Sequence, residues 1–210
     1  MILLSMKKTL FIILLLQLAL SGNAQYQTSV SDPGADYFIN PVFAGDYPDP
    51  SILRDGDTYY IVHSSFEYYP GLLIWQSKDL LNWTPVTNAL HKYVGSVWAP
   101  DLAKYKGKYY IYCPAGNTNY VVTASSINGP WNDPVDLHIG NIDPGHFVDE
   151  NGNRYLYFSN GSYVPLSDDG LSVIGEINMF MTAGRSPENG LSNVFASRGQ
   201  KLRNMAITII

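Results

Sequence analysis

Short runs of aromatic and β-branched residues recur along the chain, and glycine-containing turns separate them. The clearest runs are Tyr59–His63, Leu73–Ser77, Tyr109–Tyr112, Tyr120–Ala124 and Arg154–Phe158. Paired runs of this kind, joined by a turn that contains glycine, are the sequence pattern of β-hairpins. Outside the apolar N-terminus, helical periodicity does not extend beyond a turn or two. The pattern predicts an all-β protein.

The strand pattern is organised as a block that occurs three times. Each block opens beside an aspartate that adjoins a proline, and these aspartates are Asp49, Asp101 and Asp143. Successive aspartates lie 52 and 42 residues apart, and repeats of about 40–50 residues built from short strands are typical of β-propeller blades. The later strands of the third block, around Tyr163–Leu166, are weaker. We expect about three blades, fewer than the four or more with which propellers usually close.

Asp49 has the most restricted backbone of the three aspartates, because it lies between Pro48 and Pro50. Proline fixes its own φ and disfavours the helical conformation in the residue before it. We therefore expect a rigid, extended backbone that holds the Asp49 carboxylate in one place. A single Asp-Pro pair is typical of a turn, so the functional interpretation depends on the repetition of the block.

Composition narrows the classes of function. Of the 210 residues, 46% are hydrophobic, which is enough for a sizeable core, and 16 are tyrosine and 4 tryptophan. Such residues suit surfaces on which sugar rings stack, although they suit ordinary cores equally. The net charge of −5 and the lack of basic clusters argue against a nucleic-acid partner. Cys113 is the single cysteine, so the chain has no internal disulfide, and we expect its thiol to be buried.

Residues 1–24 have the layout of a secretory signal peptide. Lys7 and Lys8 precede the apolar run Leu10–Leu20, and small residues lead to a cleavage site after Ala24. The run is shorter than the ~18 apolar residues of a transmembrane helix, so we expect no membrane partner after cleavage. The mature protein is then secreted or periplasmic, with residues 25–37 as a polar lead-in.

Several motifs together resemble glycoside hydrolase family 43 over roughly residues 38–178. These motifs are Tyr47-Pro48-Asp49-Pro50-Ser51, Ser64-Ser65-Phe66 with Pro70-Gly71, Ser77-Lys78-Asp79-Leu80 with Asn82-Trp83, Trp98-Ala99-Pro100-Asp101 and Ile142-Asp143-Pro144. The resemblance implies a five-bladed β-propeller that hydrolyses xylose- or arabinose-containing plant polysaccharides or oligosaccharides with inversion at the anomeric carbon. Residues 38–189 are then a partial propeller that contains blades 1–3.

The resemblance also implies roles for two of the aspartates. Asp49 matches the general base that activates water, and Asp143 matches a third carboxylate that tunes the pKa of the general acid and orients the substrate. An inverting glycosidase holds its base and acid about 6.5–9.5 Å apart to admit that water. Because the innermost strand of each blade starts near the propeller axis, we expect these aspartates to converge. For Asp101 we expect a structural hydrogen-bonding role at the start of the second blade.

Aromatic residues in the matched motifs indicate how a sugar is held. Trp98 and Phe66 are candidates to stack on a pentose ring, with packing between blades as the alternative. Trp83 and Trp131 end their blocks, and we expect both in the core.

No metal or cofactor is assigned. His63 and His146 are candidate metal ligands or bases, but we expect an ordinary hydrogen-bonding role for each. Related propellers often hold calcium near the axis. Its ligands would come from later blades, so no residue of this chain is assigned to calcium.

The general acid that the resemblance requires is missing. In the family it is a glutamate followed by Gly-Pro at the start of the fourth blade, and this chain contains no Glu-Gly-Pro. Glu176 and Glu188 are the last glutamates, and neither has that context. We expect the chain as written to be inactive, because protonation of the leaving group is lost without the acid.

The tail of the sequence indicates how the acid was lost. If residues 189–209 are read one base earlier, the permitted codons include Glu-Gly-Pro, whose glutamate codon spans Ser197 and Arg198. A Gly-Asp-Tyr-Tyr follows it and resembles the turn and paired tyrosines of the first block. We predict a one-base deletion, or a sequencing error, near Asn189-Gly190, which leaves residues 190–210 out of frame. Resequencing the gene at this point tests the hypothesis.

Two classes of function follow. The stretch from Ser64 to Gly71 is closer to xylosidase-type members, which favours a β-xylosidase over an α-L-arabinofuranosidase. The other class is a non-catalytic propeller fragment that only binds glycans. In either class the expected partner is an oligosaccharide derived from xylan or arabinan.

Overall fold

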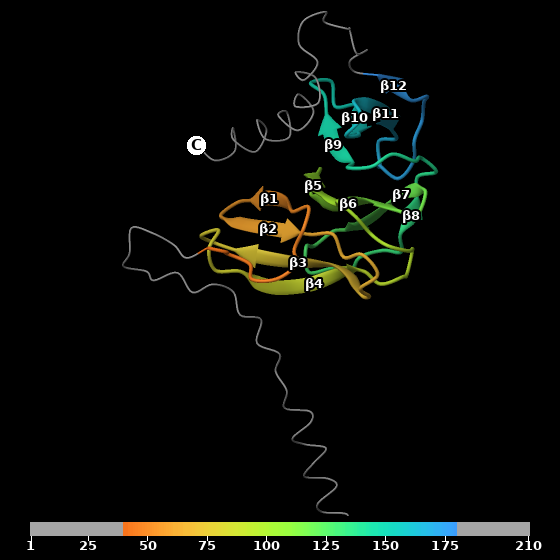
Figure 1. Cartoon of the computed structure of the whole chain (residues 1–210). Helices are drawn as coiled ribbons and strands as arrows, with labels where there is room; N and C mark the ends of the chain where they lie inside the picture. The colour runs from red at the N-terminus through yellow and green to blue at the C-terminus, as the bar shows by residue number, and fades with distance from the viewer. Residues whose placement is uncertain (1–39, 180–210) are drawn as a thin grey trace, which may run out of the picture.

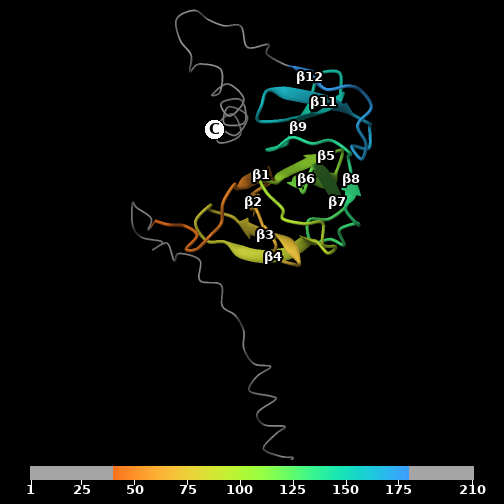
Figure 2. The ribbon, with the colours of Figure 1, turned by 45° about the vertical axis from the view of Figure 1, so that its right-hand side comes forward.

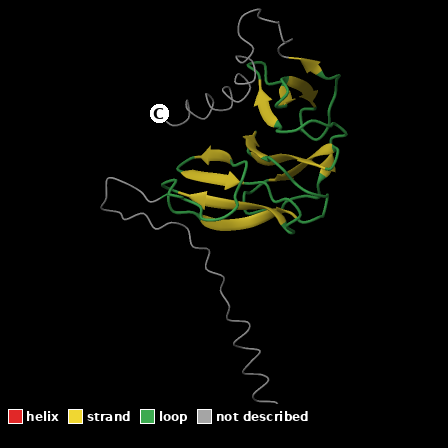
Figure 3. Cartoon of the chain, in the orientation of Figure 1, coloured by secondary structure: helices red, strands yellow, loops and turns green. Residues whose placement is uncertain are grey.

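The computed structural model describes residues 40–179, and each regular element in that range is a β-strand. The strands form three antiparallel sheets of four strands, and in each sheet the strands follow one another in chain order. Figure 3 shows only strands and loops in the described part of the chain. The all-β prediction is confirmed, whereas five blades in a whole propeller stay a prediction. The predicted signal peptide, the lead-in at 25–37 and the out-of-frame tail at 190–210 lie outside the described residues.

The three sheets follow the three blocks of the sequence. The first contains β1 (Ser51–Asp55), β2 (Thr58–Val62), β3 (Gly71–Ser77) and β4 (Thr84–Leu90); the second contains β5 (Asp101–Tyr105), β6 (Lys108–Ala115), β7 (Thr118–Ala124) and β8 (Val135–Asp136); the third contains β9 (Gly145–Val148), β10 (Arg154–Tyr157), β11 (Ser162–Leu166) and β12 (Asn178–Met179). Figures 1 and 2 show the second sheet between the other two. The first strands of the sheets are neighbours, because β5 contacts both β1 and β9.

Two-residue turns open the first two sheets and fix their register. Asp55 pairs with Thr58 around Gly56, which has a φ of 63°. In the second sheet Lys106 and Gly107 both have positive φ, at 47° and 78°, as in a type I′ turn. Such turns match the twist of paired strands, so the hairpin prediction is confirmed at these positions.

The second sheet is buried on both faces because its side chains alternate. Ile111 and Val122 point into a core shared with the first sheet, and their neighbours Tyr112 and Val121 point into a core shared with the third. Successive side chains of a strand point to opposite faces, so a sheet between two others buries both sets. Cys113 is buried in the first of these cores, as predicted, and burial raises the pKa of its thiol to about 12.

The tryptophans that end the first two blocks are core residues, as predicted. Trp83 is buried with its Nε1 donating to the Leu80 carbonyl over 2.9 Å. Trp131 is buried in the same way, and its Nε1 donates to the Ile127 carbonyl over 3.2 Å. Each indole therefore fills a core position and satisfies its polar atom within its own loop. Within residues 40–179 no helix is long and apolar enough to cross a membrane.

Candidate active site

Asp101 joins the starts of the three first strands. It is the first residue of β5, and its Oδ1 accepts a hydrogen bond from the Ser51 hydroxyl over 3.4 Å. Its Oδ2 accepts one from the His146 amide over 2.8 Å. Ser51 begins β1 and His146 lies in β9, so one buried carboxylate contacts all three sheets. These contacts agree with the structural role expected for Asp101, and they bring the strand starts together.

The prediction that the three aspartates open their sheets in the same way is wrong for Asp101. The residue two positions before each first strand has a positive φ and precedes a proline, and these residues are Asp49 (53°), Ala99 (26°) and Asp143 (58°). Asp101 lies two positions later, inside its strand. In the second block the aspartate follows the proline instead of preceding it. Alignment on the prolines would have given the correct register.

The expected extended backbone at Asp49 is also wrong. Its φ of 53° lies in the left-handed region, which L residues rarely adopt and which a following proline does not favour. The two residues after β2 hold the segment in place. His63 Nδ1 donates to the Tyr47 carbonyl over 3.0 Å, and the Ser64 amide donates to the Pro48 carbonyl over 3.1 Å. These tertiary hydrogen bonds stabilise a conformation that the local sequence disfavours.

The carboxylates of Asp49 and Asp143 are open to approach. Asp49 is exposed, and its Oδ2 accepts a hydrogen bond from the Ser64 hydroxyl over 2.7 Å. No residue within 40–179 donates a hydrogen bond to Asp49 Oδ1 or to the partly exposed carboxylate of Asp143. Each residue lies two positions before a strand, and Asp101 joins the starts of these two strands. The structure thus places each of the two predicted residues just before a strand that contacts β5.

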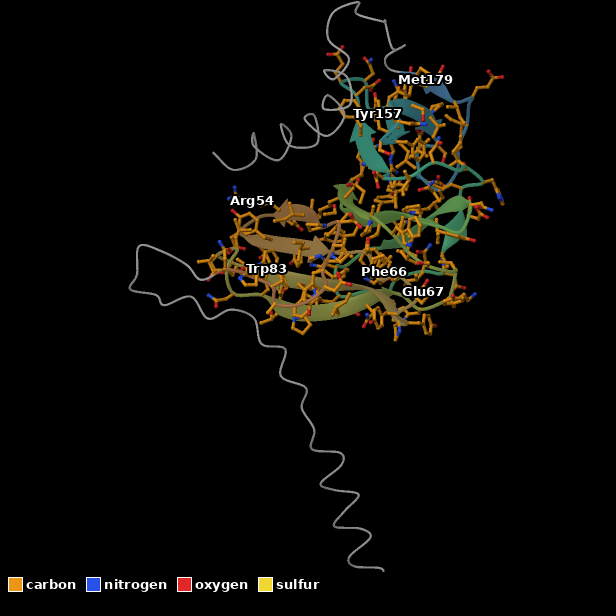
Figure 4. The ribbon with its side chains drawn as sticks, in the orientation of Figure 1. Arg54, Phe66, Glu67, Trp83, Tyr157 and Met179 are labelled. Atoms are coloured by element: carbon orange, nitrogen blue, oxygen red, sulfur yellow. The ribbon has the colours of Figure 1, made fainter. Side chains whose placement is uncertain are left out.

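Phe66 and Trp98 lie on paired backbone segments beside Asp49. Phe66 exchanges two hydrogen bonds with Val97, at 2.9 and 3.0 Å, and Trp98 follows directly. The Trp98 side chain is 46% exposed, with its Nε1 donating to the Ser96 hydroxyl over 2.7 Å. The half-exposed indole therefore presents surface on which a sugar can stack. Phe66, labelled in Figure 4, is partly buried.

Both histidines have hydrogen-bonding roles. Burial lowers the pKa of His63, whose Nδ1 donates to a backbone carbonyl. His146 Nε2 accepts from Arg154 Nε over 3.0 Å, and burial together with the Arg154 charge lowers the pKa of His146 to about 4. Both imidazoles are therefore neutral at pH 7. The described residues form no group of three or more His, Cys, Asp or Glu suited to a metal ion.

Arg154 is a structural residue that the sequence reasoning missed. Its side chain is 2% exposed, and its guanidinium lies 4.6 Å from the centre of the Tyr105 ring and 4.2 Å from that of Tyr110. Its Nη2 donates to the Tyr112 hydroxyl over 3.0 Å. Ring faces and neutral acceptors thus surround a buried cation that orients His146. In the sequence, its position as the single charged residue at the start of the apolar run 154–158 could have indicated a buried arginine.

Comparison with known proteins identifies the family. The model for glycosyl hydrolases family 43 matches residues 38–202, most of the chain. The chain belongs to this family. The match includes residues 190–202, the first part of the tail predicted to be out of frame.

Curated relatives of this family 43 chain carry related names. It is 40% identical over 136 residues to a beta-xylosidase from Bacillus subtilis (strain 168), covering 56% of this chain and 26% of the relative. It is 39% identical over 137 residues to a xylan 1,3-beta-xylosidase from a Vibrio species, again 56% of this chain and 26% of the relative. It is 38% identical over 136 residues to a non-reducing end alpha-L-arabinofuranosidase from Bacteroides ovatus, covering 57% and 25%. The aligned region spans about a quarter of each relative's length.

Solved structures of the family share the fold. A GH43 protein from Bacillus licheniformis superposes with a TM-score of 0.62 at 32% identity, covering 70% of this chain and 34% of that protein. A xylan beta-1,4-xylosidase from Bacillus halodurans C-125 gives a TM-score of 0.58 at 33% identity, covering 66% and 33%. The described sheets thus correspond to about a third of these chains.

Proposed function

We propose that Asp49 and Asp143 belong to the active site of an inverting glycoside hydrolase acting on xylose- or arabinose-containing oligosaccharides, most like a β-xylosidase. The observation that carries this proposal is the shared placement of the two residues. Each occupies a left-handed, pre-proline position two residues before a first strand, and Asp101 joins those strands. Strained backbone of this kind is concentrated at functional sites, and membership of family 43 supplies the reaction class.

In the proposed mechanism, Asp49 accepts a proton from the water that attacks the anomeric carbon. The bond from that carbon to the leaving oxygen breaks as a general acid protonates the oxygen from the other side, which inverts the configuration. The negative charge of Asp143 raises the pKa of the acid and keeps it protonated near neutral pH. Trp98 and Phe66 stack on the pentose ring.

The general acid is the missing component. The chain contains no Glu-Gly-Pro, and we place the lost glutamate in the reading frame one base earlier, across the codons of Ser197 and Arg198. General-acid catalysis contributes about 10²–10⁴-fold in rate. The 210-residue chain is therefore expected to be inactive on unactivated glycosides, while the frame-restored protein is active.

Hydrolysis by the two forms tests the proposal. The frame-restored protein should release xylose from xylobiose and from an aryl β-xyloside, with the α-anomer of xylose as first product by NMR. The 210-residue chain should fail most clearly on xylobiose, because a sugar alkoxide needs the proton more than a phenolate does. An inactive restored protein, or an Asp49→Ala variant as active as wild type, would contradict the assignment. Parallel assays on an aryl α-L-arabinofuranoside decide between the two substrates.

The alternative is a fragment that binds glycans without cleaving them. The half-exposed Trp98, next in the chain to Ala99, which shares the Ser64 hydroxyl with Asp49, favours this function for the 210-residue chain. Quenching of tryptophan fluorescence by xylobiose, lost in Trp98→Ala, would support it. Unchanged fluorescence would exclude it.

We also propose that the protein is secreted or periplasmic, with its signal peptide cleaved after Ala24. The support is the layout of basic, apolar and small residues at 1–24. N-terminal sequencing of the mature protein should begin at Gln25. An intact N-terminus in the mature protein would contradict this.

A further inference from the structure

Ser64 is the described residue whose side chain donates a hydrogen bond to the Asp49 carboxylate. Its Oγ lies 2.7 Å from Asp49 Oδ2. Ser64 follows the end of β2 and is only 7% exposed, so its side chain has little freedom to move. Its backbone amide donates to the carbonyl of Pro48, the residue before Asp49. Main chain and side chain of Ser64 thus hold the same short segment.

The second sheet sets the direction of the Ser64 hydroxyl. The Ala99 amide donates to Ser64 Oγ over 2.7 Å. A serine hydroxyl has one hydrogen to donate and accepts through its lone pairs. Because the Ala99 amide occupies a lone pair, the hydrogen is directed to the remaining partner, Asp49 Oδ2. Ala99 is the counterpart of Asp49 at the start of the second sheet, so the Ser64 hydroxyl bridges two equivalent positions.

We propose that Ser64 is a positioning residue for Asp49, an inference that rests on the role of Asp49 as general base proposed above. By holding Oδ2, Ser64 fixes the rotation of the carboxylate. Oδ1, which accepts no hydrogen bond from residues 40–179, is then the oxygen that takes the proton from water. A base works only at hydrogen-bonding distance from that proton, and a misplacement of about 1 Å can cost about 10²-fold in rate. The orientation of the base therefore depends on how the first two sheets meet.

Ser51 provides a matched control for a purely structural role. Its hydroxyl accepts the Leu102 amide over 3.0 Å and lies 3.4 Å from a carboxylate oxygen of Asp101. Like Ser64, it is a buried serine of the first sheet's chain that bridges to the second sheet. It makes no hydrogen bond to the Asp49 carboxylate. Loss of either serine hydroxyl is expected to lower stability, but only loss of the Ser64 hydroxyl changes the orientation of the Asp49 carboxylate.

The experiment uses the frame-restored protein. Ser64→Ala should lower kcat by about 10- to 10²-fold with KM near the wild-type value, because the sugar contacts are untouched. Ser51→Ala should lose a comparable amount of thermal stability and keep kcat near wild type. Ser64→Cys, a near-isosteric change to a weaker donor, should fold like wild type and still lose kcat. In an Asp49→Ala background, Ser64→Ala should cause no further loss of kcat, because its effect passes through Asp49.

The outcomes separate the two proposals. If the restored wild type is active and both Ser64 variants keep its kcat, the positioning role is overturned and the proposed function stands. The positioning role is also overturned if Ser51→Ala loses as much kcat, or if Ser64→Ala and Asp49→Ala act additively. If the restored wild type hydrolyses neither xyloside nor arabinofuranoside, the proposed function fails and the role of Ser64 fails with it.

Discussion

A partly buried histidine and a buried arginine lie close to Asp143 along the chain. His146 lies three residues after Asp143 and is kept neutral by burial and by the Arg154 guanidinium beside it. The Arg154 guanidinium lies over the rings of Tyr105 and Tyr110. A neutral histidine and a buried arginine thus support the strand that follows Asp143.

The lowered pKa of His146 predicts a loss of stability in mild acid. The folded state holds a pKa of about 4, against 6.5 for the free side chain, so between these values the unfolded chain binds more protons. The free energy of unfolding is highest above pH 6.5 and decreases as the pH is lowered to 4. The total decrease due to His146 is about 3 kcal/mol. Urea unfolding at pH 7, 6, 5 and 4 measures this slope. His146→Gln, which retains an acceptor for Arg154, should flatten it, and an unchanged slope would contradict the prediction.

Gly170 is expected to be intolerant of a side chain. Its φ is 72°, and an added Cβ would lie 2.5 Å from Arg154 Cζ. Gly161 is a matched control, since its φ is 82° but no atom lies within 4 Å of an added Cβ. Gly161→Ala should cost about 1–2 kcal/mol from backbone strain, and Gly170→Ala about 2–5 kcal/mol because overpacking against Arg154 adds to it. Denaturant midpoints compare the two, and equal losses would mean that Arg154 moves aside.

At the scale of elements, the sheets are joined by a few polar bridges at the starts of their first strands. Asp101 accepts from Ser51 of β1 and from His146 of β9. At the other end of the same strands, Lys104 of β5 forms an ion pair with Asp55 of β1 over 2.6 Å. The buried Asp101 bridge contributes more to the contact between the sheets, because ion pairs near the surface add little to stability.

Removal of the Asp101 carboxylate should loosen the stack of sheets. Asp101→Ala leaves the partly buried His146 amide without its acceptor, which costs about 1–3 kcal/mol. Hydrogen exchange of that amide should accelerate together with a lower denaturant midpoint. Asp57→Ala, which removes an exposed ion pair with Lys78, is the control and should change stability little. Equal effects of the two variants would rule out the bridging role.

At the scale of the whole molecule, the third sheet has one face that does not pack on the second. Phe147 is 37% exposed there, and its ring contacts Tyr157, which contacts Tyr163 in turn. The opposite face of this sheet, with Leu156 and Val164, is fully buried against the second sheet. The difference between the two faces makes this aromatic surface prone to association.

We expect the 210-residue chain to self-associate through this aromatic face. Phe147→Glu should reduce the associated fraction in sedimentation velocity, because a charge in an apolar contact is costly to bury. Tyr93→Glu is the control, as Tyr93 is an exposed aromatic residue in the loop after β4. Association that is equally reduced by both variants would place the contact elsewhere.

Sequence patterns were sufficient to predict those structural features that depend on residues close together in the sequence. The strand runs, the glycine turns and the core positions of Trp83 and Trp131 were predicted correctly. Alternation, turn conformation and local indole hydrogen bonds all operate over a few residues. The block repeat likewise predicted that the first strands start side by side, whereas the roles of Asp49 and Asp143 come from the resemblance to the family and stay predictions.

Only the tertiary structure decided how those residues are held. The left-handed backbone of Asp49, the offset of Asp101 and the enclosure of Arg154 come from segments that meet when the sheets stack. Ser64 lies 15 residues from Asp49 and 35 from Ala99, yet it contacts both. Hydrogen bonds over such separations override local preference, because burial makes an unpaired polar group more costly than a strained backbone. The sequence by itself thus determined the strands and the candidate carboxylates, and the packing of the sheets determined their orientation.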